Sequence, residues 1–199
     1  HVRFRESLGV QFPRATRLIC AFQNHNDVVR FQNVLVKRLA RFGLSLAEEK
    51  SSLLRFGRFA ERDCREMNES KPGVFDFLGF THYCGHSRAG RYKLKRKTSK
   101  KKLRQKLQAM KDWLRSNLST PSEQVWQTLN RKLRGHYQYY GVSDNWDYLL
   151  SYRDKVIEPV SHWIGRRSQR SMSKTDFYKQ LLPCHPLVRP HRLTNLFAN

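Results

Sequence analysis

The pattern of apolar and polar positions divides the chain into an N-terminal part of short, mixed elements and a C-terminal part of amphipathic helices. The apolar run 18–22 has the length of a strand. Apolar residues then recur every three or four positions from Val28 to Phe42, which predicts a helix. Gly43 follows directly and is typical of helix ends. The segments 44–46 and 52–56, on either side of 47–50, again predict strands.

The middle of the chain predicts more sheet. Polar residues dominate between 61 and 73, and we expect a loop there. Aromatic and aliphatic residues at 74–83 predict a strand, and turn-forming residues separate it from 91–95, whose alternating pattern predicts a hairpin partner. Basic residues interrupt the apolar ones in 1–17, and that segment receives no assignment.

Beyond Thr98 the periodicity becomes helical. One apolar face is formed by Leu103, Leu107, Met110 and Leu114, and we expect the basic side chains of this helix on the opposite face. A second helical face runs from Val125 to Tyr140. A third helix is expected over 147–166, and a short fourth one over 174–182. The composition changes near residue 96, which predicts a domain boundary and an α+β fold: short strands plus one helix, followed by a basic, mainly helical region.

The net charge of the chain narrows the range of functions that its sequence fits. The 199 residues contain 39 Lys and Arg against 16 Asp and Glu, which gives a formal net charge of +23. The densest stretch carries nine basic side chains and no acidic one, at Lys93, Lys95, Arg96, Lys97, Lys100, Lys101, Lys102, Arg104 and Lys106. Like charges at this density repel one another unless a polyanion lies nearby, and nucleic acid is the usual polyanion. A solvated helix face or a disordered basic tail is the alternative.

Other classes of protein fit less well. The four cysteines are far apart and lack CxxC spacing, so we expect reduced thiols in a cytoplasmic protein. No run of about 18 apolar residues is present, so we expect no membrane helix. The segment 82–86 contains His, Cys and His but lacks the second ligand pair of a zinc site. We expect no cofactor in this chain. The start has neither Met nor a signal segment, which suggests a missing front.

Further basic residues alternate with aromatic ones. Three cations, Arg131, Lys132 and Arg134, precede three tyrosines, Tyr137, Tyr139 and Tyr140. Arginine pairs with phosphate and tyrosine stacks on unpaired bases, so the combination is typical of structured-RNA binding. Tyr137 and Tyr140 fit the core of a helical bundle equally well, whereas we expect Tyr139 on the surface. A further basic cluster consists of Arg166, Arg167 and Arg170.

Several strings resemble a known family. Three of them are similar to the back half of a reverse-transcriptase palm: Phe-Gly-Leu-Ser-Leu-Ala-Glu-Glu-Lys-Ser at 42–51, Arg-Phe-Gly-Arg-Phe-Ala at 55–60 and Phe-Asp-Phe-Leu-Gly-Phe at 75–80. Three more resemble the thumb and maturase-specific region of group II intron-encoded proteins: Lys-Arg-Lys-Thr-Ser-Lys-Lys-Lys at 95–102, Leu-Asn-Arg-Lys-Leu-Arg-Gly-His-Tyr-Gln-Tyr-Tyr-Gly-Val at 129–142 and Arg-Arg-Ser-Gln-Arg at 166–170. The string at 129–142 is the most specific. The resemblance implies the C-terminal half of a palm over 18–95 and a thumb and maturase-specific region over 96–199, with 1–17 unassigned.

One part of the family pattern is missing. In this family a Tyr-Ala-Asp-Asp turn holds the Mg²⁺ ions that activate the primer hydroxyl. That turn belongs just before Leu18, where the sequence reads Arg14-Ala15-Thr16-Arg17. The resemblance therefore implies a chain without polymerase activity by itself, and we expect a truncated or frame-disrupted reading frame upstream. Lys50 occupies the position of a general acid near the departing pyrophosphate, although a surface lysine after a turn is the favoured interpretation.

The function implied by the resemblance is that of an RNA-binding fragment. Such a fragment would bind group II intron RNA, and an RNA/DNA heteroduplex is a second candidate partner. It would assist splicing and retromobility, while the RNA performs the chemistry. Two alternatives stay open. The chain would be an active RNA-directed DNA polymerase if another chain supplied the missing acids, or it would be a general basic DNA-binding helical module.

Overall fold

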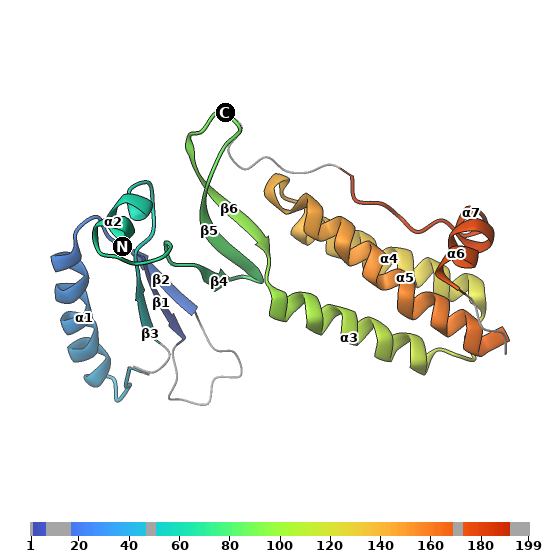
Figure 1. The fold of residues 1–199 in the computed structure, drawn as a ribbon. Coiled ribbons are helices and arrows are strands. Elements are labelled where there is room, and N and C mark those ends of the chain that lie inside the picture. Colours follow the sequence, from blue (N-terminus) through green and yellow to red (C-terminus); the bar gives the residue numbers. More distant parts are fainter. Residues whose placement is uncertain (1, 7–16, 47–50, 169–172, 192–199) are drawn as a thin grey trace. The chain divides into compact units, whose positions relative to one another are not determined.

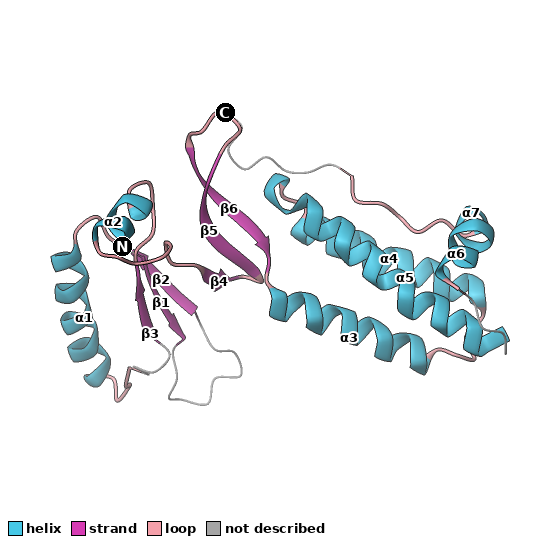
Figure 2. Ribbon diagram, viewed as in Figure 1, coloured by secondary structure: helices cyan, strands magenta, loops and turns pink. Residues whose placement is uncertain are grey.

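The fold is mixed α+β and divides into two compact units, one over 1–95 and one over 96–199. The division falls beside the change in composition near residue 96. The computed structural model describes the following segments, shown in Figures 1 and 2: 2–6, 17–46, 51–168 and 173–191. Within these segments, no helix combines the length and the apolar character needed to span a bilayer.

The first unit contains an antiparallel sheet with the strand order β2-β1-β3. Its strands are β1 (Val2–Glu6), β2 (Arg17–Ala21) and β3 (Ser51–Leu54). The strands expected at 18–22 and 52–56 are thus confirmed, whereas the strand expected at 44–46 is wrong, because that segment has no regular secondary structure. The central strand, however, comes from the segment that received no assignment. Its signal is a short alternation in which apolar Val2 and Phe4 flank charged Arg3.

Helix α1 (His25–Ala40) confirms the first expected helix and begins three residues earlier than the apolar period indicated. The helix ends at Ala40, shortly before the expected Gly43. Gly43 has a φ of +65°, a left-handed conformation that glycine adopts without strain. Beyond it, the Leu44 N–H donates to the Leu39 carbonyl, 3.0 Å away, as in a Schellman ending.

The expected loop at 61–73 is wrong at its start, because α2 (Ala60–Glu66) forms there. Its buried residues are Ala60 and Cys64, one helical turn apart. These small side chains suffice for the inner face, while the remaining positions are polar. An ion pair between the Arg55 guanidinium and the Glu69 carboxylate, 2.6 Å apart, joins the residue after β3 to the segment after α2.

The second sheet has the order β4-β5-β6, with β4 (Phe75–Phe77), β5 (Phe80–His86) and β6 (Tyr92–Thr98). The single strand expected at 74–83 is therefore split into a hairpin. Leu78 and Gly79 form its turn with φ values of 48° and 82°, the positive pair that a type I′ turn requires. Leucine is uncommon at such turn positions, so the sequence pattern did not predict this turn.

The second unit is built on three helices, which Figure 2 shows in cyan: α3 (Lys100–Ser116), α4 (Ser122–Tyr140) and α5 (Trp146–Ser168). Helices α3 and α4 both contact α5. The core is apolar and includes Leu114, Leu129, Leu133, Leu149, Val156 and Val160, each at most 2% exposed. The expected fourth helix is irregular, with α6 (Lys174–Asp176), a π-helical turn at Phe177–Leu181, and α7 (Leu182–Cys184).

A buried amide holds the start of α3. Asn145 lies in the short 3₁₀ turn Ser143–Asn145 between α4 and α5 and is fully buried. Its Oδ1 accepts the backbone N–H of Thr98 at 2.7 Å, and its Nδ2 donates to Thr98 Oγ1 at 2.8 Å and to the Tyr140 carbonyl at 3.0 Å. One side chain thus joins Thr98, which precedes the N-cap residue Ser99 of α3, to the end of α4.

The segment after α7 covers one flank of α4. Asn130 donates from Nδ2 to the Pro186 carbonyl at 3.1 Å and accepts the Val188 N–H at 2.8 Å. Trp126 stacks on His185 with ring centroids 5.2 Å apart. This flank of α4 is therefore occupied by the chain itself, and only its other sides can meet a partner.

Candidate nucleic-acid interface

The basic run 93–106 spans two kinds of structure. Its first four cations, Lys93, Lys95, Arg96 and Lys97, lie on β6 and are only partly exposed. The stem of Lys95 crosses Gly85, where an added Cβ would come within 2.8 Å of its Cδ. The other five, Lys100, Lys101, Lys102, Arg104 and Lys106, lie on α3 and are all exposed. The helix therefore supplies the more accessible part of the run.

The charges on α3 occupy several sides of the helix rather than only the face opposite the core. Lys100 and Arg104, four residues apart, share the flank that later carries Lys111 and Arg115. Lys102 and Lys106, also four apart, lie on the other flank, and Lys101 points between the two. The expected opposite face is thus too narrow a description. We call the five cations Lys100, Lys101, Lys102, Arg104 and Lys106 the α3 basic surface.

The first turn of α3 concentrates positive charge where the helix itself is positive. It contains Lys100, Lys101 and Lys102 and no acidic residue. The helix macrodipole places about half a positive charge at this end, and each nearby cation costs about 0.3–1 kcal/mol. Folding alone does not favour this arrangement, whereas a bound anion would be attracted by the lysines and by the helix end together.

Helix α4 adds charge beside α3. The Lys132 ammonium lies 5.0 Å from the ring centroid of Trp113 on α3, so this flank of α4 faces α3. Arg131 and Arg134 are exposed on the outer side, and Arg131 donates from Nη2 to Thr128 Oγ1 at 3.3 Å. Cations of α3 and α4 thus lie on adjoining surfaces of the second unit.

The three tyrosines of α4, Tyr137, Tyr139 and Tyr140, differ in their exposure to solvent. Tyr137 and Tyr140 are 5% and 4% exposed, so they lie in the core, the alternative that the sequence left open. Burial raises the pKa of both phenols, which keeps them neutral. Their burial removes them from the candidate surface. Tyr139 is 56% exposed and is the tyrosine of this group that a base can reach.

A buried histidine, His136, lies next to the buried tyrosines, and the sequence did not predict a role for it. His136 stacks on Tyr152 of α5 with centroids 3.8 Å apart and lies 4.7 Å from the Tyr140 ring. Neither imidazole nitrogen has a hydrogen-bond partner among the residues that the structure describes. Burial, and secondarily the charge of Lys106, lowers the pKa of His136 to about 4. The residue is therefore neutral and structural.

His136 predicts an acid-sensitive second unit. Its pKa falls from 6.5 in the unfolded chain to about 4 in the fold, so the unfolded state binds more protons between these values. Stability is full above pH 6.5 and is lost as the pH falls towards 4, by up to about 3 kcal/mol. Urea unfolding at several pH values measures this loss through tryptophan fluorescence, because all four tryptophans lie beyond residue 96.

Two histidine variants make the test specific. We expect His136→Phe to flatten the pH dependence between 4 and 6.5, because the ring stacking remains and the titrating group is gone. The exposed His25, changed to Gln, should leave the dependence as it is. An unchanged pH profile in His136→Phe would contradict this explanation.

The remaining site residues predicted from the sequence lie in different places. Arg167 lies over the Trp163 ring at 5.6 Å and donates from Nη1 to the Thr120 carbonyl, so it joins α5 to the loop before α4. Arg166 is exposed near the end of α5. Arg170 and Lys50 lie outside the described residues, and neither can be placed.

The described segments contain no group of three or more His, Cys, Asp or Glu side chains that could hold a metal ion. Comparison with known proteins adds no family: no family model, no curated protein and no solved structure matches the chain. The arrangement found is thus a helical surface rich in positive charge, with one exposed tyrosine beside it.

Proposed function

We propose that the chain binds folded RNA through the α3 basic surface and the adjoining face of α4. The observation that carries this proposal is the first turn of α3. Three lysines lie there, at the positive end of the helix, and this turn contains no acidic residue. A polyanion converts this unfavourable arrangement into a favourable one, because its phosphates interact with the side chains and with the helix end.

The resemblance described above supports a more specific form of the proposal. In that form the first unit is the C-terminal half of a reverse-transcriptase palm, and the second is a thumb and maturase-specific region. The partner is group II intron RNA, and the chain helps this RNA to fold for splicing and retromobility in the cytoplasm. Polymerase activity is not part of the proposal, because no aspartate occupies the Arg14–Arg17 segment.

RNA is favoured over duplex DNA by the exposed aromatic side chain. Tyr139 follows Lys132 by seven residues, so the two lie on the same side of α4. A tyrosine beside cations can stack on an unpaired base, which loops and bulges of folded RNA provide and a regular duplex does not. A DNA-binding module would need only the charges.

Competition at fixed salt tests the choice of nucleic acid. A labelled, folded group II intron RNA is bound to the purified chain and displaced by unlabelled RNA or by duplex DNA of equal phosphate number. We expect the RNA to displace the label at least tenfold more effectively. Tyr139→Ala should reduce this preference more than it reduces total affinity. Equal displacement by DNA would favour the general DNA-binding alternative.

A further inference from the structure

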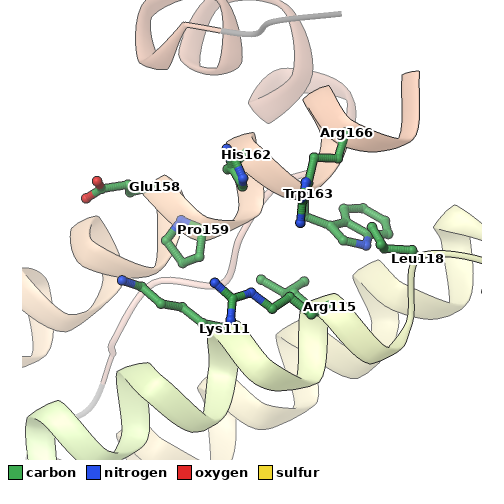
Figure 3. Close-up of a pocket in the computed structure, with 9 residues that line it drawn as sticks. Lys111, Arg115, Leu118, Glu158, Pro159, His162, Trp163 and Arg166 are labelled. Atoms are coloured by element: carbon green, nitrogen blue, oxygen red, sulfur yellow. The ribbon is translucent and has the colours of Figure 1, made fainter. Parts of the chain in front are cut away.

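Helices α3 and α5 leave a pocket between them on the flank of α3 that carries Lys100 and Arg104. Its volume is about 200 Å³. Figure 3 shows its walls, with side chains of α3 on one side and of α5 on the other. The residues around it are Lys111, Leu114, Arg115, Leu118, Glu158, Pro159, His162, Trp163 and Arg166.

Basic residues line both walls of this pocket. Lys111 and Arg115 are four residues apart on α3, and His162 and Arg166 are four apart on α5, so each pair lies along one wall. Glu158 is the acidic residue of the lining. Without counting the histidine, three cations and one carboxylate give the lining a formal charge of about +2. This excess of positive charge is suited to an anion that carries more than one negative charge.

The ion pair between Arg115 and Asp112, beside the pocket, is weak. Arg115 lies 3.9 Å from the Asp112 carboxylate, and the two side chains are 69% and 57% exposed. Exposed pairs of this kind contribute at most about 1 kcal/mol. The guanidinium of Arg115 can therefore turn to a ligand at little cost.

The remaining lining is apolar. Leu118 is exposed and Pro159 is partly exposed, so these two form the accessible apolar wall, whereas Leu114 and Trp163 are only 2% and 3% exposed. Carbon-rich walls beside a cationic rim fit a ligand with an anionic group on a less polar body. The volume lies below the usual range of about 300–1,000 Å³ for sites of drug-sized ligands, which restricts the ligand to about one nucleotide.

We propose that this pocket binds the phosphate monoester at an RNA end, with the terminal nucleoside against the apolar wall. A terminal phosphate carries about −1.5 to −2 charges at pH 7 and three acceptor oxygens, which the Lys111, Arg115 and Arg166 side chains can share. An internal phosphodiester carries one charge and continues as chain on both sides, so it is a poorer match. The inference that the phosphate monoester belongs to an RNA rests on the proposed function, whereas the affinity of the pocket for a phosphate monoester does not.

The test compares oligonucleotides too short to span the α3 basic surface. Calorimetry measures binding to the full chain of a trinucleotide with a 5′-phosphate, the same trinucleotide with a 5′-hydroxyl, a trinucleotide with a 3′-phosphate, and a nucleoside monophosphate. We expect one of the two phosphorylated ends to bind at least tenfold more tightly than the hydroxyl form. Equal or tighter binding of the free monophosphate would replace an RNA end with a mononucleotide as the ligand.

Variants connect the effect to the pocket. Arg115→Gln combined with Arg166→Gln should abolish the tenfold preference, while Glu158→Gln should strengthen phosphate binding severalfold. A gain of affinity cannot result from misfolding. Lys179→Gln is the matched control, because Lys179 is exposed and lies outside both surfaces. Failure of Glu158→Gln to strengthen binding, or persistence of the preference in the double variant, would overturn the assignment to this pocket.

The outcomes distinguish the two proposals. No preference for a terminal phosphate would overturn the pocket proposal even if the chain still retains long folded RNA. A clear preference in a chain that fails to retain folded RNA would uphold the pocket and overturn the proposed function.

Discussion

Replacing Lys100, Lys101, Lys102 and Arg104 with glutamine is expected to weaken binding of folded RNA by a factor on the order of 10²–10³ at 100 mM salt. Each cation in contact with a phosphate releases about 0.7–0.9 of a counterion, and the four together should lower the salt slope by about three. Glutamine keeps the helix propensity of lysine and arginine. Filter binding of folded RNA across a salt series measures both quantities.

The same substitutions should not weaken the fold. The three lysines lie at the positive end of α3, so their removal is expected to stabilise the second unit slightly, by a few tenths of a kcal/mol each. Opposite effects on binding and stability are the sign of residues kept for a ligand. Urea unfolding, followed by tryptophan fluorescence, measures the second effect.

A control of equal charge comes from the first unit. Four exposed cations of α1 and the residue after it can be changed to glutamine together: Arg30, Lys37, Arg38 and Arg41. We expect this variant to lose less than a tenth as much affinity. If it loses as much as the α3 variant, net charge alone governs binding and the α3 basic surface has no special role.

The second large effect concerns stability. Asn145→Ala is expected to destabilise the second unit by about 2–4 kcal/mol, because it removes the partner of two backbone groups in a fully buried place. The Thr98 N–H and the Tyr140 carbonyl lose the bonds of 2.7 and 3.0 Å that Asn145 makes with them. Urea unfolding observed through the tryptophans gives the free energy directly.

Two further variants show whether the buried network is the cause. Thr98→Val removes the hydroxyl and keeps the backbone bond, so an intermediate loss is expected. Asn117→Ala removes a half-buried amide that donates to the Trp113 carbonyl at 2.7 Å, at the end of α3. This control should cost less than about 1 kcal/mol. A loss in Asn145→Ala no larger than that in Asn117→Ala would contradict the role given to the network.

The helices were predictable from sequence because their packing depends on long apolar stripes. In α3, Leu103, Met110 and Leu114 repeat at helical spacing and are all buried in the structure. Such a stripe extends over several turns and survives the many lysines between its members. It also fixes which basic residues must be exposed, so the accessibility of Lys100 to Lys106 followed from the same pattern.

Elements with shorter or weaker signals were not predictable in this way. The strand β1 has only two apolar residues in its five, and α2 buries only Ala60 and Cys64. The hairpin at Leu78 depends on a positive φ of 48° in a residue that seldom adopts one. In each of these cases tertiary packing decides the local structure.

The site could be predicted only in part. A tyrosine has an apolar ring and a polar end, so the sequence could not decide between core and surface for Tyr137 and Tyr140. The pocket between α3 and α5 joins residues from 40 to 55 positions apart in the chain, and no local pattern connects Lys111 with His162. Charge density was visible from the sequence, whereas the shape that concentrates it was not.

Filter binding of folded group II intron RNA to the purified chain, repeated from dilute buffer to high salt, tests the proposed RNA binding most directly. We expect tight retention in dilute buffer and a logarithm of the affinity that falls linearly with the logarithm of the salt concentration. Absence of retention in dilute buffer, or retention that salt does not change, would contradict it.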